Sequence, residues 1–106
     1  MDTAVAFTGV RHITCGIENE ISVELQAVMW SMIDHDRQQG KDLDYLQVFE
    51  LKPIFQNGVE MQEITHIQEQ PRRKKKITIE SETPISAKIF MIDDIDHVTM
   101  LPNHEY

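Results

Sequence analysis

One segment of this chain, residues 22–39, has the spacing of an amphipathic helix, and it largely decides the fold class. Its apolar residues recur at intervals of three and four, which places their side chains on one helical face. Ser22 can cap the first turn, and Gly40 is positioned to end the helix in the left-handed conformation. Trp30 falls at the edge of the apolar stripe. The stripe that we expect to be buried consists of Leu25, Val28, Met29, Met32 and Ile33.

The remaining segments have the composition of β-strands, because they are short, rich in β-branched and aromatic residues, and separated by turn formers. Asn57-Gly58 is the clearest hairpin signal. Pro53 is expected to end the strand that precedes this hairpin, and a slip in the apolar pattern near Ile64 suggests a bulge. The predicted strands are residues 10–15, 43–53, 59–68, 75–81, 86–93 and 97–102.

The predicted order of elements is β-α-β-β-β-β-β, with short loops. One amphipathic helix packed on a mostly antiparallel sheet of five to six strands satisfies this order, so we expect an α+β fold. The strand at 43–53 has apolar residues at both parities, which indicates a central strand covered on both faces, or covered on one and flanked on the other. The 106 residues are enough for one domain, residues 1–106, and we expect residues 1–9 to be poorly ordered.

The composition disfavours several classes of protein. Apolar residues make up 41% and charged residues 26%, which is ordinary globular usage and argues against disorder. No apolar run approaches the roughly 20 residues that span a bilayer, and no signal peptide is recognisable. The single cysteine, Cys15, excludes an internal disulfide and favours a reduced setting. We therefore expect a cytoplasmic protein without a membrane partner, and a thiol that is buried and inert.

The charge is negative and unevenly distributed. The chain has 18 acidic and 10 basic residues, and half of the basic ones are consecutive, from Arg72 to Lys76. An acidic surface repels nucleic acid and can attract basic proteins, although it can also serve solubility alone. The basic run could meet phosphates, protect a strand against edge-to-edge association, or pair with a second copy. We expect no direct nucleic-acid binding, and a monomer or homodimer.

Three aspartates and a histidine interrupt the apolar pattern near the end of the chain, at Asp93, Asp94, Asp96 and His97. A calcium loop would need a glycine at its sharp turn and a closing glutamate, and both are missing here. Aspartate favours turns because its side chain bonds the local backbone. We therefore expect a hairpin turn over Asp93–Asp96, with His97 beginning the returning strand and negative charge concentrated at one end of the sheet.

No residue pattern indicates catalysis or a cofactor. The histidines lack the close pairing of a zinc site, and Cys15 with His12 lacks a third orienting group. The glycines are isolated, so there is no phosphate-binding loop. We expect no enzyme, no cofactor and no metal, and we leave the histidines without a ligand role: His12, His35, His66, His97 and His104.

Four stretches carry a resemblance to a known family, and they are ITCGI, VELQAVMWSMID, DLDYLQVFEL and IFMIDDIDHVTMLPNHEY. They resemble a family of small uncharacterised proteins, a domain of unknown function, from low-GC Gram-positive bacteria and their mobile elements. The resemblance extends from about Arg11 to Tyr106. The chain departs from the family pattern at Ile95, where the family prefers glycine, and in LPNHEY, which replaces a more apolar ending.

The resemblance carries over no catalytic or ligand residues, but it suggests a role. Some relatives of this size on plasmids and phages resemble anti-defence proteins, including inhibitors of type II CRISPR nucleases. These nucleases hold guide and target in positively charged channels, which an acidic domain could occupy. The resemblance thus implies a non-enzymatic inhibitor, carried by a mobile element, that acts in the bacterial host cytoplasm by blocking guide RNA or DNA binding. The alternative is a housekeeping interaction or adaptor module of unknown partner. The expected partner-binding residues are Asp34, Asp36, Asp42, Asp44, Asp93, Asp94, Asp96 and Trp30.

Overall fold

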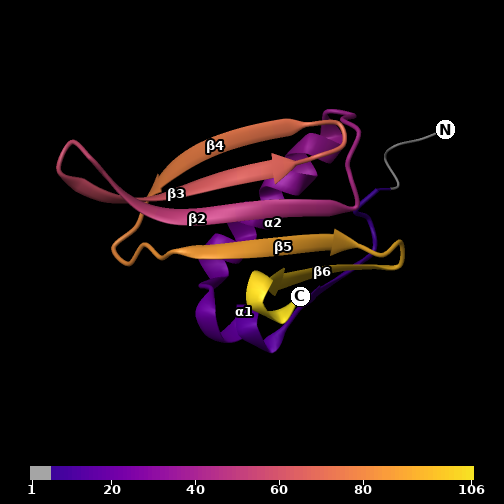
Figure 1. Ribbon diagram of the computed structural model, residues 1–106, viewed down its shortest axis with the longest axis horizontal. Coiled ribbons are helices and arrows are strands. Elements are labelled where there is room, and N and C mark those ends of the chain that lie inside the picture. The colour runs from indigo at the N-terminus through magenta and orange to yellow at the C-terminus, as the bar shows by residue number, and fades with distance from the viewer. Residues whose placement is uncertain (1–5) are drawn as a thin grey trace.

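The computed structural model describes residues 6–106, which form a six-stranded mixed sheet with one main helix (Figure 1). The strands lie side by side in the order β1-β6-β5-β2-β3-β4. The expected α+β class is therefore observed. The elements are β1 (Val10–Ile13), α1 (Cys15–Glu20), α2 (Val23–Gln38), β2 (Leu46–Gln56), β3 (Val59–Gln68), β4 (Arg73–Glu80), β5 (Ala87–Asp93), β6 (His97–Pro102) and the 3-10 turn η2 (Asn103–Glu105).

The sheet is antiparallel except at one edge. Strands β2 to β6 pair with their neighbours in antiparallel register, whereas β1 lies parallel to β6, with Val10 opposite His97. This parallel pair makes the sheet mixed. Strand β2 is central, as its two-sided apolar pattern predicts, and β4 forms the edge opposite β1.

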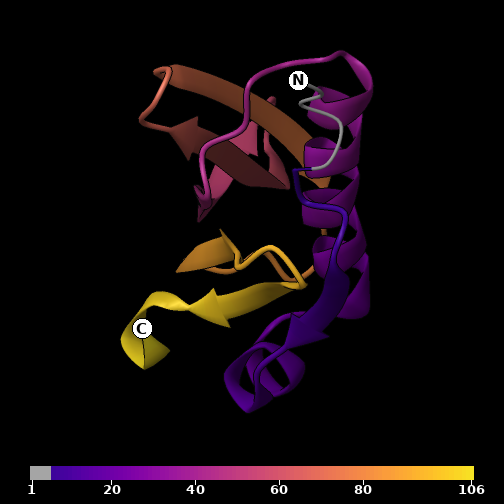
Figure 2. The same cartoon turned by 90° about the vertical axis from the view of Figure 1, so that its right-hand side faces the viewer.

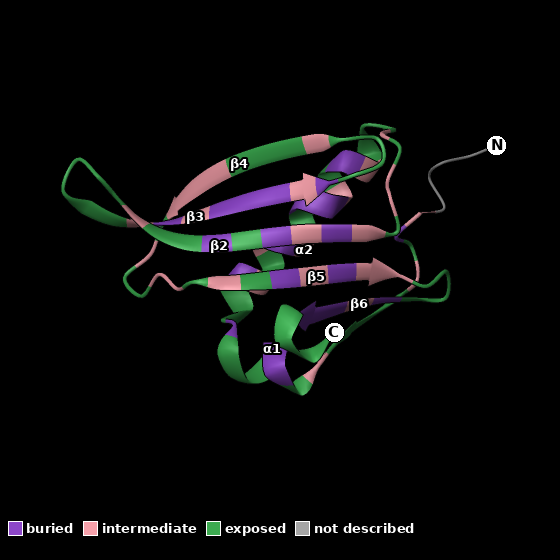
Figure 3. Ribbon diagram, in the orientation of Figure 1, coloured by how far each residue is buried: buried purple, intermediate pink, exposed green. Residues whose placement is uncertain are grey.

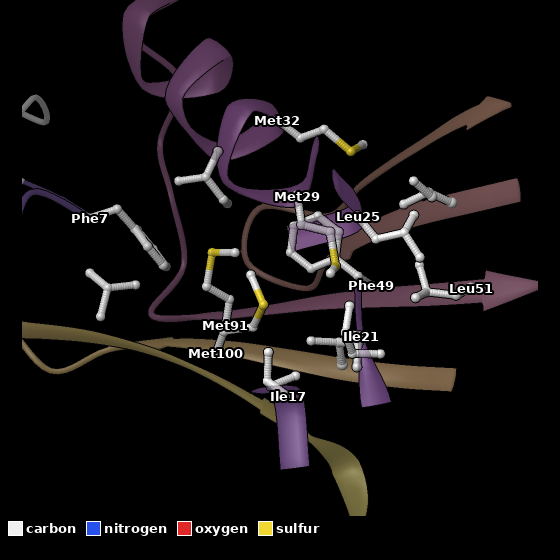
Figure 4. Packing of buried hydrophobic residues seen from close by; sticks show 14 residues of the cluster. Phe7, Ile17, Ile21, Leu25, Met29, Met32, Phe49, Leu51, Met91 and Met100 are labelled. Carbon is white, nitrogen blue, oxygen red and sulfur yellow. The ribbon is translucent and has the colours of Figure 1, made fainter. Parts of the chain in front are cut away.

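Helix α2 covers one face of the sheet (Figure 2). The Ser22 hydroxyl accepts a hydrogen bond from the Leu25 N–H at 3.2 Å, and Gly40 has φ 72°, so both predicted ends of the helix are confirmed. The predicted stripe is buried apart from Val28, which is partly buried. It packs against side chains from four strands, which are Phe49, Leu51, Ile64, Ile89, Met91, Val98 and Met100 (Figure 4). Each buried side chain of this kind contributes roughly 1.5–3 kcal/mol.

The short helix α1 was not expected, because six residues are too few to show a helical period. It begins where the Thr14 hydroxyl accepts a hydrogen bond from the Ile17 N–H at 3.4 Å, so β1 ends at Ile13 instead of residue 15. Gly16 and Ile17 face the interior of the protein, whereas Cys15 is exposed. The prediction of a buried thiol is therefore wrong.

Strand β2 continues past Pro53, where we expected it to end. Its pairing with β5 stops at Leu51, while its pairing with β3 continues to Gln56. Pro53 therefore lies where one side of β2 has no neighbouring strand, and a proline without an N–H is tolerated at such an edge.

The expected bulge near Ile64 is also absent. The β2–β3 register is continuous from Val48 opposite Ile67 to Gln56 opposite Val59. The apolar pattern slips because polar side chains fill inward positions on either side of Ile64. These are the buried residues Gln62, His66 and Gln68.

Both predicted turns are confirmed. Asn57 and Gly58 have φ 55° and 78°, as the tight hairpin turn requires. In the β5–β6 turn, the Asp93 carboxylate accepts a hydrogen bond from the Ile95 N–H at 3.1 Å. Ile95 itself has φ 66°, the left-handed conformation that favours glycine.

The segment before β1 packs against the rest of the protein. Phe7 is buried in the core, and its N–H donates to the Asp93 carboxylate at 3.0 Å. The expected disorder therefore does not extend to residues 6–9, and its remainder, residues 1–5, lies outside the described residues. Within residues 6–106, no helix has the length and apolar character needed to cross a bilayer.

Candidate functional site

A polar pocket of about 430 Å³ lies on the helix-covered side of the sheet. The second half of α2, the loop that follows it, and strands β2, β3 and β4 contribute to its walls. Its inner side chains are buried, whereas Lys74 and Lys75 are exposed at its rim. The lining residues are Asp36, Lys41, Gln47, His66, Gln68, Arg73, Lys74 and Lys75.

Hydrogen bonds to the backbone fix the orientation of the two buried glutamines. Gln68 Oε1 accepts from the Asp44 N–H at 3.0 Å, so its Nε2 is the donor to the carbonyls of Asp42 and Pro71. Gln47 Nε2 donates to Gln68 Oε1 at 2.7 Å and to the Asp44 carbonyl at 2.8 Å. Gln47 Oε1 is therefore left as an acceptor, and it lies 2.6 Å from His66 Nε2.

These bonds define the protonation of His66. Since Gln47 Oε1 can only accept, His66 Nε2 must carry a proton. Burial lowers the pKa of His66 to about 4, and Arg73, Lys75 and Lys41 lower it further while Asp36 opposes them. His66 is thus neutral near pH 7. Its second ring nitrogen, Nδ1, is unprotonated and lies 3.8 Å from an Asp36 carboxylate oxygen.

Positive charge surrounds this buried group. Lys41 pairs with Asp36 at 3.4 Å. Arg73 donates to Gln68 Oε1 at 3.2 Å and to the Asp42 carbonyl. Arg73 and Lys75 share the parity of Ile77 and Ile79, which pack against the core, so this side of β4 faces α2. The inward side of the basic run therefore belongs to the pocket.

Three of the predicted partner-binding residues lie along α2. Asp36 is buried in the pocket, so it does not belong to an exposed acidic cluster. Asp34 pairs with Arg11 and, at 3.5 Å, with Arg37. The Arg11 guanidinium lies 4.6 Å from the ring centroid of Trp30. Asp34 and Trp30 thus hold β1 against the helix.

The other predicted aspartates lie near one end of the sheet. The carbonyl of Tyr45 accepts from the Asp93 N–H at 2.8 Å, so the loop with Asp42 and Asp44 adjoins the β5–β6 turn. Asp94 and Asp96 are exposed in that turn, whereas both oxygens of Asp93 bond backbone N–H groups. We call the surface carboxylates of this region the acidic end, and they are Asp42, Asp94 and Asp96, which are exposed, and Asp44, which is half-buried.

A second hollow, of about 260 Å³, lies on the sheet face opposite α2. We call it the outer hollow. Its centre is apolar, from Leu46, Val48, Ile67 and Phe90, and its rim is charged, from Asp44, Glu50, Glu69 and Lys88. Figure 3 shows how buried, half-buried and exposed residues follow one another along β2 and β5. Tyr106 packs edge-on against Phe90, with ring centroids 5.0 Å apart, so the C-terminal turn covers the neighbouring part of the face.

The sequence did not predict the pocket residues as a group. The available signal was that Gln62, Ile64, His66 and Gln68 occupy every second position of β3. Alternate positions share one face of a strand, so three polar side chains lie on the buried face. The partners of that face come from Gln47 and α2, which are distant in sequence. Within residues 6–106, no group of three His, Cys, Asp or Glu side chains is arranged to hold a metal ion.

The comparisons with known proteins agree with the expected family. A family model described as a staphylococcal protein of unknown function (DUF960) matches residues 10–105. The fold is similar to the crystal structure of a protein of unknown function from Enterococcus faecalis, with a TM-score of 0.71 and 22% identity over 100% of this chain and 98% of that chain. At this identity the likeness shows the fold alone. No curated protein matches the chain.

Proposed function

We propose that this chain, which belongs to the DUF960 family of staphylococcal proteins of unknown function, is a non-enzymatic binding protein for a partner with a basic surface. The observation that carries the proposal is the outer hollow. Its centre is apolar, and three carboxylates and one lysine surround it.

The chemistry of the outer hollow suits lysine and arginine side chains of a partner. Their aliphatic stems can lie on Leu46 and Val48 while their charged heads reach Glu50 and Glu69. An apolar centre within a polar rim is the usual anatomy of a protein interface. Asp44 belongs to both the outer hollow and the acidic end, so the two form one continuous acidic surface.

The most concrete partner is a type II RNA-guided nuclease, which the family resemblance suggests. Such a nuclease binds guide and target in positively charged channels. In this proposal the acidic surface occupies a channel in the host cytoplasm, and its carboxylates take the positions of nucleic-acid phosphates. The net charge of −8 would favour the encounter and would keep the chain itself from binding nucleic acid.

Competition in a gel shift tests the proposal. Purified type II nuclease and labelled guide RNA are mixed with increasing amounts of this protein, and a denaturing gel reports whether the RNA stays intact. Loss of the shifted band with intact RNA is the expected result. The double variant Glu50→Lys/Glu69→Lys should restore the shifted band, whereas Glu82→Lys, an exposed charge reversal in the β4–β5 loop, should not.

Two other results would contradict this function. Shortened RNA would indicate an enzyme. An unchanged shift would remove the nuclease as partner and favour the alternative, an adaptor module whose outer hollow receives another basic protein. Self-association of such an adaptor through β4 is disfavoured, because Arg73, Lys74, Lys75 and Lys76 lie on that edge strand.

A further inference from the structure

We propose that the polar pocket around His66 binds a small organic phosphate that also carries a hydroxyl or N–H donor. The pocket is on the helix-covered side of the sheet, and the outer hollow is on the opposite side. The two sites therefore open on opposite faces of the sheet, and the Asp44 backbone, which bonds Gln47 and Gln68, connects them.

The charges of the pocket favour a dianion. Asp36 is the one carboxylate among the lining residues, and Lys41 pairs with it at 3.4 Å. Arg73, Lys74 and Lys75 remain, so positive charge exceeds negative charge here in a chain of net charge −8. Arginine and lysine together are the usual side chains that bind phosphate groups.

On the inner wall of the pocket, two hydrogen-bond acceptors lie side by side, one from His66 and one from Asp36. The bonds of Gln68 and Gln47 put the His66 proton on Nε2, which leaves Nδ1 as an acceptor. Nδ1 and the Asp36 carboxylate oxygen are 3.8 Å apart, and no side chain or backbone N–H within residues 6–106 donates to Nδ1. Hydroxyl or N–H groups of a ligand that enters the pocket would donate to these two acceptors.

The size of the pocket limits the ligand to a small molecule. A volume of about 430 Å³ lies within the range of sites for metabolites and cofactors. A nucleic-acid strand would extend beyond the pocket onto a chain of net charge −8, which repels it. The chemistry thus fits a sugar phosphate, a glycerol phosphate or a mononucleotide.

Titrations of the full chain followed by amide and side-chain NMR test the site. The three probes are inorganic phosphate, glycerol 3-phosphate and glycerol. We expect both phosphates to shift the signals of His66, Arg73 and Lys75, and glycerol to leave them unchanged. Glycerol 3-phosphate should bind about tenfold more tightly than inorganic phosphate, since its hydroxyls can donate to His66 and Asp36.

Two lysines of β4 provide a matched pair of variants. Lys75→Gln should weaken the binding of glycerol 3-phosphate by about tenfold, which is the loss of one charge-assisted bond. Lys76→Gln should leave it unchanged, because Lys76 lies on the other face of the strand, 3.7 Å from Glu63. Asp36→Asn should remove most of the preference for glycerol 3-phosphate over inorganic phosphate.

The proposal is overturned if neither phosphate shifts the pocket signals, or if Lys75→Gln and Lys76→Gln weaken binding equally. Equal affinity for the two phosphates would overturn the role given to His66 and Asp36 as acceptors. Glu50→Lys/Glu69→Lys should bind glycerol 3-phosphate normally. Failure of the phosphate site is therefore distinguishable from failure of the outer hollow.

Discussion

The imidazole of His66 lies flat against the ring of Phe49, with 4.4 Å between ring centroids and 11° between ring planes. Phe49 is fully buried, so one face of the imidazole rests on the apolar core. At the edge of the ring, His66 Nε2 donates a hydrogen bond to Gln47 Oε1 at 2.6 Å. This placement keeps water from the imidazole and disfavours its charged form, which is why the pKa of His66 falls to about 4.

The stability of the protein should therefore depend on pH through His66. The unfolded chain takes up the proton near pH 6.5, while the folded protein resists it until about pH 4. Unfolding is thus favoured as the pH falls through this window, and stability is highest above pH 6.5. This shift in the pKa of His66 corresponds to a loss of about 3 kcal/mol in the free energy of unfolding as the pH falls through the window. Urea unfolding at a series of pH values from 7 to 4 measures it.

The matched variant is His66→Leu, which keeps a side chain on Phe49 but cannot titrate. Its free energy of unfolding at pH 7 will be lower, because Gln47 loses a partner. The informative quantity is how steeply the free energy of unfolding falls between pH 6.5 and pH 4. This fall should be shallower in His66→Leu than in the unchanged protein. Identical slopes would show that His66 does not carry the pH dependence.

Ile95→Gly should stabilise the protein by about 0.5–1 kcal/mol. Ile95 has φ 66°, where an L side chain is strained, and glycine relieves that strain at some entropic cost. The side chain is 83% exposed, so its removal loses little packing. Thermal unfolding of Ile95→Gly, with Ile95→Asn as an intermediate case, measures the effect. A lower melting temperature for the glycine variant would contradict the strain.

The aspartates of the β5–β6 turn should separate into structural and surface residues. Asp93→Ala should cost about 1–2 kcal/mol, because two backbone N–H groups, those of Phe7 and Ile95, lose their acceptor. Asp94→Ala and Asp96→Ala should change stability by less than about 0.5 kcal/mol. Chemical unfolding of the three variants tests this, and equal costs would contradict it. A charge reversal meant to test partner binding should therefore spare Asp93.

Gly9→Ala should destabilise the attachment of β1. A Cβ at Gly9 would come within 2.6 Å of the Asp96 backbone, which leaves no room for a methyl group. We expect a cost of about 1–3 kcal/mol and faster hydrogen exchange at the Val10 N–H, which donates to the Asp96 carbonyl at 2.9 Å. Gly40→Ala is the comparison, since its surroundings are open and its φ is 72°. It should lower stability without changing exchange at Val10.

Local patterns predicted most of the fold. The helix was visible because its stripe and both of its ends follow sequence rules that act within a few residues. The same is true of the Asn57-Gly58 hairpin and the Asp93–Asp96 turn, where side-chain and backbone preferences act on the turn itself. All six strand segments lie within three residues of their predicted positions.

The candidate sites depend on relationships that a local pattern does not contain. Gln47 and Gln68 bond across 21 positions of sequence, and the polar positions of β3 suggested a bulge because their partners were unknown. Pro53 suggested a strand end because proline has no N–H to donate, but β2 continues because β5 stops short of Pro53 and leaves that side unpaired. Asp36 and Asp34 were grouped as surface charges, although the fold buries one and pairs the other with Arg11.

The pairing of β1 with β6 brings two segments that are distant in sequence into one ladder. Val10 lies opposite His97, which is 87 positions later in the sequence, so β1 has no partner in the sheet until β6 has been synthesised. During synthesis, β1 and Phe7 must wait while the rest of the sheet forms, because contacts so distant in sequence are completed late. We therefore expect the β1 edge of the sheet to form after the antiparallel strands have paired.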